Sequence, residues 1–159
     1  MPFPRGGAEL VGSSYDGCIT PRVRQPGPPV YRLYAWAPSP GLGPRWLFAH
    51  TGVSASTRVP GIVGYELDAR TRAAPRGAVV VGEGGGVCSP NNDPAPARGT
   101  LAQSTLYTAR SGAFVFAAGT LGWLYGLEPV PQASPDAPVR PDPRVVAITD
   151  NLLARALRR

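Results

Sequence analysis

The sequence predicts an α/β fold that is mostly β by content, with a mixed sheet of about six strands and one packing helix at the C-terminal end. Two strand-like runs, residues 104–109 and 113–118, are joined by a short turn signal at residues 110–112, which predicts a hairpin. Short apolar or alternating runs precede this hairpin. The last stretch of the chain, in contrast, has apolar residues at helical spacing.

Four strand candidates come before the hairpin, and each is followed by proline, glycine or other turn residues. One of them alternates between apolar and polar residues, and the others are short and apolar enough for buried strands. They are residues 31–36, 46–49, 62–67 and 79–81.

The hairpin strands differ in pattern. In residues 104–108 Leu106 lies on the face opposite Thr105 and Tyr107, whereas residues 113–118 (AFVFAA) are apolar on both faces. Such a run predicts a central strand that is covered on both sides. One terminal helix covers only one side, so we expect an open apolar face that pairs with a second copy or with an upstream half of the same protein.

Residues Pro143–Leu157 are predicted as a helix. Asp142 can cap its N-terminus, Pro143 suits the first helical position, and Val145 and Ile148 begin an apolar face. The sheet and this helix together predict one domain over residues 30–159, after an irregular segment at residues 1–29. Glycine- and proline-rich loops are expected at residues 84–99 and 129–142.

The charge pattern does not favour nucleic-acid binding. The net charge is +6 and all sixteen basic residues are arginine, but they are dispersed, and the one local cluster lies at the C-terminal helix end, where cations are favourable anyway. No apolar run is long enough to span a membrane and no signal peptide is recognisable, so we expect a cytoplasmic protein. Cys18 and Cys88 are then expected as free thiols, with a disulfide left open for an exported protein.

Glu66 and Asp68 are the strongest candidates for chemistry. They stand two apart on a predicted strand and therefore share a face, where two carboxylates can perform acid–base work or hold a metal. Capping of a turn by Asp68 and pairing of Glu66 with an arginine explain the same residues. His50 is the only imidazole, and its place before Thr51 and Gly52 is typical of a turn residue as well as of a catalyst.

Several segments resemble one family when taken in order. These are GIVGYELD at residues 61–68, STLY at 104–107, SGAFVFAAGTLGW at 111–123 and ITDNLL at 148–153. Over about residues 45–157 the chain resembles the C-terminal region of proteins similar to the large (beta) subunit of N,N-dimethylformamidase. The resemblance implies a domain similar to class I glutamine amidotransferases.

The related enzyme is an iron-dependent amidase that acts on a C–N bond, with tyrosine and glutamate ligands upstream of the region that resembles this chain. In this chain, Tyr65 and Glu66 are the candidate metal ligands of the same residue types. No cofactor is expected in this chain alone. An amidotransferase triad would need a cysteine elbow and a late histidine, but residues 119–122 read GTLG. The resemblance therefore implies a non-catalytic or incomplete C-terminal domain that serves as a structural shell or assembly domain, inactive alone.

A small ligand- or protein-binding module is the alternative function. Trp36, Trp46 and Trp123, together with the loop at residues 84–99, could line a groove for a ligand or partner. A buried core explains the same tryptophans, and the sequence leaves both interpretations open.

Overall fold

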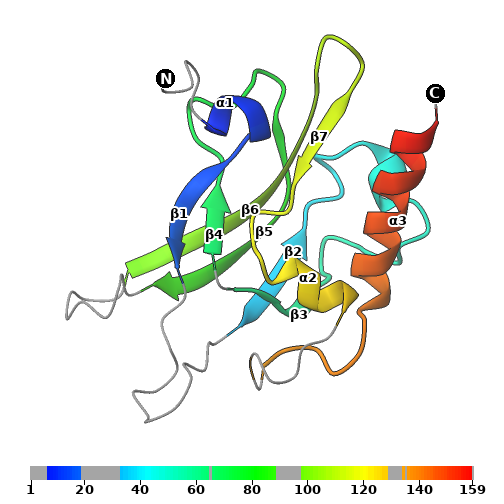
Figure 1. The fold of residues 1–159 in the computed structure, drawn as a ribbon. Coiled ribbons are helices and arrows are strands. Elements are labelled where there is room, and N and C mark those ends of the chain that lie inside the picture. The colour runs from blue at the N-terminus through cyan, green and yellow to red at the C-terminus, as the bar shows by residue number, and fades with distance from the viewer. Residues whose placement is uncertain are drawn as a thin grey trace.

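A computed structural model describes residues 7–18, 33–64, 66–88, 98–128, 134 and 136–158 (Figure 1). The elements in chain order are α1 (Gly7–Val11), β1 (Ser14–Cys18), β2 (Tyr34–Pro38), the 3₁₀ helix η1 (Arg45–Phe48), β3 (Val59–Val63), β4 (Glu66–Ala69), β5 (Val79–Cys88), β6 (Arg98–Thr108), β7 (Phe114–Ala117), α2 (Trp123–Leu127) and α3 (Pro143–Leu157).

The strands form two antiparallel sheets instead of one. A five-stranded sheet has the order β3-β2-β5-β6-β7, and β1 pairs with β4 in a two-stranded sheet. The longest ladder joins β5 to β6, from Val79 opposite Leu106 to Cys88 opposite Arg98. The predicted fold class, mostly β by content with a C-terminal helix, is confirmed.

The predicted β6–β7 hairpin is confirmed, and its register places Thr105 opposite Ala117 and Thr108 opposite Phe114. Gly112 has a φ of +86°, which suits glycine in a tight turn. The central position expected for residues 113–118 is wrong, because β7 is an edge strand and its four residues are only half-buried. An apolar run alone cannot distinguish a central strand, covered on both faces, from an edge strand that is only partly covered.

The middle strand is β5, and its glycines were wrongly assigned to a loop. Residues 84–88 and 98–99 belong to β5 and β6, while residues 89–97 lie outside the described residues. A Cβ atom on Gly82 would clash with the Trp36 ring, and one on Gly84 would clash with the backbone carbonyl of Ala35. These glycines therefore let β2 and its tryptophan approach β5 closely.

Three further expectations need correction. Residues 46–49 lie mainly in η1, which follows Pro44 and buries Leu47, so this apolar run is one helical turn instead of a strand. Residues 62–67 are divided between β3 and β4, which belong to different sheets. The irregular structure expected for residues 1–29 is wrong for Gly7–Val11 and Ser14–Cys18, which form α1 and β1.

Helix α3 has the predicted bounds and the predicted cap. The Asp142 side chain accepts a hydrogen bond from the Arg144 amide (2.9 Å), and Pro143 occupies the first turn. Asn151 Nδ2 donates to the carbonyl oxygens of Leu47 (3.0 Å) and Ala49 (2.8 Å), which fastens the helix to η1. In Figure 1 the helix lies beside η1 and close to α2.

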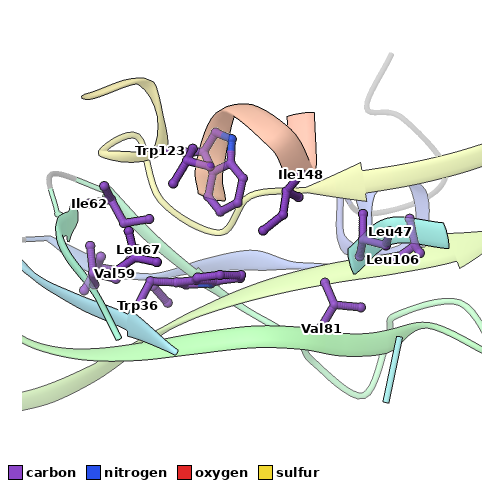
Figure 2. Close-up of a cluster of buried hydrophobic side chains, with 12 residues drawn as sticks. Trp36, Leu47, Val59, Ile62, Leu67, Val81, Leu106, Trp123 and Ile148 are labelled. Carbon is purple, nitrogen blue, oxygen red and sulfur yellow. The ribbon is translucent and has the colours of Figure 1, made fainter. Parts of the chain in front are cut away.

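The core lies between the five-stranded sheet and the layer formed by η1, α2 and α3. Trp36 and Trp123 meet edge to face with ring centroids 5.3 Å apart, and Figure 2 shows Trp123 and Ile148 facing Trp36 and Val81. Trp36 Nε1 donates to Ser104 Oγ (3.0 Å), and Ser104 Oγ donates to the carbonyl oxygen of Ala118 (2.6 Å). Ser104 is thus a buried polar support of the core.

Candidate functional site

Glu66 and Asp68 share one face of β4, as their spacing predicts, while Leu67 between them is buried in the core. The strand is fixed by β1 on one side and by residues 119–121 on the other. The Asp68 amide donates to the carbonyl oxygen of Gly119 (2.9 Å), and the Leu121 amide donates to that of Glu66 (3.4 Å). Backbone hydrogen bonds therefore hold both carboxylates beside the segment that follows β7.

A cavity of about 350 Å³ opens where these segments meet, and we call it the acidic pocket. Its polar side chains include Glu66, Asp68 and Ser13. Its apolar side chains include Val11, Phe116 and Leu121. The pocket thus joins α1, the residue before β1, strand β4, and the end of β7 with the segment that follows it.

Burial raises the pKa of the Asp68 carboxyl above its ordinary value, and the negative charge of Glu66 raises it further. Within the described residues no arginine forms an ion pair with either carboxylate. The pairing of Glu66 with an arginine, which the sequence left open, is therefore not seen. The pocket holds two like charges on one wall without a compensating cation from the described chain.

Thr120, which also lines the acidic pocket, connects the segment after β7 to the junction between β3 and β4. The sequence did not indicate this role. Thr120 Oγ1 accepts hydrogen bonds from the amides of Gly64 (2.8 Å) and Gly122 (3.1 Å) and donates to the carbonyl oxygen of Gly64 (2.8 Å). A Cβ atom on Gly122 would clash with the carbonyl of Ile62. The GTLG segment is therefore a close-packed junction between β3 and β4, and its two glycines around a threonine were the available signal.

His50 lies apart from the two carboxylates. It has a φ of +59° and lines a separate cavity of about 240 Å³ with Trp46, Asn151 and Arg155. The Arg155 guanidinium stands 5.8 Å from the centroid of the Trp46 ring, within cation–π range. The structure does not bring His50 together with Glu66 and Asp68, so the three candidates do not form one catalytic set.

The described residues contain no metal site built from histidine, cysteine, aspartate or glutamate side chains, and an iron site with tyrosine ligands stays a prediction. No three histidine, cysteine, aspartate or glutamate side chains in the described part of the chain converge to hold a metal ion. Tyr65 lies outside the described residues, and so do the side chains of Cys18 and Cys88, whose backbones belong to β1 and β5. Glu66 and Asp68 alone are too few ligands for such a centre.

The tryptophans do not form the groove that the alternative function requires. Trp36 and Trp123 are only 1 % and 5 % exposed and belong to the core, where Trp123 Nε1 also donates to Thr149 Oγ1 (3.2 Å). Trp46 is half-buried and packs against Phe114, with ring centroids 5.5 Å apart. The core interpretation of the tryptophans is confirmed for Trp36 and Trp123.

Across the described ranges, no helix has both the length and the apolar character that crossing a membrane would require. This agrees with the absence of a long apolar run in the sequence.

The sequence model of one protein family, described as "N,N-dimethylformamidase beta subunit-like, C-terminal", matches residues 2–137. The match covers most of the chain, so the chain belongs to this family. It starts earlier than the resemblance at residues 45–157 and ends before α3, so the ITDNLL segment lies beyond it. No curated protein and no solved structure matches the chain significantly. The similarity to class I glutamine amidotransferases stays a prediction.

Proposed function

We propose that this member of the N,N-dimethylformamidase beta subunit-like family serves as a non-catalytic C-terminal domain, a structural shell or assembly domain of a larger amidase. The observation that carries the proposal is the placement of the candidate residues. Glu66 and Asp68 share a pocket, but His50 lies in another, and no three histidine, cysteine, aspartate or glutamate side chains of the described residues converge to hold a metal ion.

The fold supports an assembly role through the surface that it leaves open. β7 is an edge strand, and edge strands present unpaired backbone groups to a neighbouring chain. Leu10, Val11 and Leu121 are exposed, and two of these line the acidic pocket close to β7. The proposed partner is the upstream part of the same family of proteins, since the matching family is itself defined as a C-terminal region.

The proposal is tested by assaying the purified chain for hydrolysis of N,N-dimethylformamide, with and without added iron(II). We expect no formation of dimethylamine above the rate in buffer under either condition. Turnover that depends on iron and is lost in Glu66→Gln but kept in Asp150→Asn would contradict the proposal. That result would make Glu66 a metal ligand or a catalytic residue of this chain.

A further inference from the structure

We propose that the acidic pocket binds an organic cation, namely an alkylammonium or guanidinium group on a short apolar stem. The group can come from a free amine or from a basic side chain of a partner protein, which present the same chemistry. This inference concerns a ligand and does not depend on the assembly role proposed above.

The first support is the uncompensated charge of the pocket. The chain carries sixteen arginines against ten acidic residues, so arginine partners are abundant. Glu66 and Asp68 nevertheless lie side by side on β4 without an ion pair in the described part of the chain. A bound cation would relieve the repulsion between them and would donate charge-assisted hydrogen bonds to their carboxylate oxygens.

The second support is Ser13, which is independent of the acidic pair. Ser13 lines the same pocket, is only 2 % exposed, and its Oγ has no hydrogen-bond partner among the described residues. A buried hydroxyl without a partner destabilises the folded chain. An N–H group of a bound ammonium or guanidinium ion would donate a hydrogen bond to this oxygen. The ligand would thus supply the partner that the Ser13 hydroxyl lacks among the described residues.

The apolar wall decides between an organic cation and a metal ion. Divalent calcium and magnesium take six or more oxygen ligands, so water would have to complete the set that two carboxylates and one hydroxyl begin. The side chains of Val11, Phe116 and Leu121 would contribute nothing to a bare ion. They would, however, bury the methylene groups of a stem, and this burial of apolar surface favours binding.

The experiment titrates the full chain with n-butylammonium and n-butylguanidinium and follows backbone amide resonances of β4 and residues 119–121 by NMR. Uncharged n-butanol is the matched ligand without the charge. We expect saturable shifts with both cations and a Kd at least about tenfold weaker in Glu66→Gln and in Asp68→Asn. Asp150→Asn, which removes an exposed carboxylate of α3, should leave the Kd unchanged.

Ser13→Ala separates a ligand contact from a merely structural hydroxyl. We expect the free chain to unfold at the same or a higher temperature, because a buried unpaired group is removed, and the cations to bind several-fold more weakly. Unchanged binding in Ser13→Ala, or in both carboxylate variants, would overturn the proposal.

Two further arms identify the source of the cation. Tighter binding of a capped Gly-Arg-Gly peptide than of n-butylguanidinium supports a partner's side chain, and the reverse order supports a free amine. Equal shifts with n-butanol, or displacement of the shifts by magnesium at equal concentration, would contradict an organic-cation site.

Discussion

Asp68 connects the sequence pattern to a measurable effect on stability. Its pKa is raised in the folded chain by burial and by Glu66, so the folded state binds a proton more tightly than the unfolded state does. Stability is therefore lost as the pH rises from the unfolded pKa through the higher folded pKa. We expect Asp68→Asn to be more stable than the parent at pH 7, by less than about 1 kcal/mol because solvent screens this partly exposed site.

Thermal unfolding at several pH values checks this. The advantage of Asp68→Asn should vanish below about pH 3, where the aspartate is protonated in both states. An equal advantage at pH 3 and pH 7 would show that packing, and not charge, is responsible.

Asp142 should show the opposite pH dependence. Burial tends to raise its pKa, but hydrogen bonds from the Arg144 side chain and amide, with the arginine's charge, lower it overall. The stability from Asp142 is thus present above its unfolded pKa and lost as the pH falls through the folded pKa. We expect Asp142→Ala to destabilise the chain by about 1 kcal/mol at pH 7 in urea unfolding, and by less in acid. A loss that grows in acid would contradict the assignment.

At the level of single residues, the sequence located the carboxylate pair correctly because strand periodicity is local: two residues apart means the same face. It could not reveal that Ser13 and Phe116 complete the pocket, since both are brought there by tertiary packing. Thr120 was missed for the same reason, because its partners at Gly64 lie 56 residues away in sequence.

Among the elements, the β3–β4 junction depends on Thr120. Thr120→Val keeps the shape of the side chain but leaves the Gly64 amide without its acceptor, and the Gly122 amide keeps only its longer bond to the Gly64 carbonyl oxygen (3.3 Å). We expect a loss of about 1–3 kcal/mol in the free energy of unfolding, as for one buried group left unpaired. Thr120→Ser retains the hydroxyl and is the matched control, with a much smaller loss. A loss in Thr120→Val that is no larger than the loss in Thr120→Ser would contradict a leading role for the hydrogen bonds of the hydroxyl.

Strand β7 offers a second test of packing, and its position at the sheet edge lowers the loss of stability that we expect there. Phe116 meets Trp123 with ring centroids 5.6 Å apart, but its side chain is only half-buried. We expect Phe116→Ala to lower the free energy of unfolding by about 1–2 kcal/mol, which is less than full burial would give. Val115→Ala, on the other face, should cost less. A larger loss at Val115 would mean that the other face of β7 carries the packing.

Local signals predicted α3 and the β6–β7 hairpin well, since a cap, a proline, a helical repeat and a glycine turn act over a few residues. The glycine-rich part of β5 was misassigned because composition favours a loop, whereas the close approach of Trp36 is what requires glycine there. Similarly, the division of residues 62–67 between two sheets depends on Thr120 and not on any local pattern.

At the scale of the whole molecule, the structure gives a different physical reason for the predicted open apolar face. The sequence predicted an open apolar face because a single helix could not cover a central strand. The structure instead has an edge strand, β7, whose four residues are half-buried, together with exposed apolar side chains at Leu10, Val11 and Leu121. Edge strands and exposed apolar side chains are both typical of association surfaces, and Val11 and Leu121 line the acidic pocket.

The most direct test of the assembly role is the mass of the purified chain by light scattering across a concentration series, with binding of an apolar-surface dye read in the same samples. The chain has a mass of 16.6 kDa. We expect the measured mass to rise above that value with concentration, or the dye to bind a monomer whose partner is missing. The double variant Val11→Ser, Leu121→Ser should reduce both the rise in mass and the dye binding. A mass that stays at 16.6 kDa at every concentration, with no dye bound, would contradict the assembly role and favour an independent module.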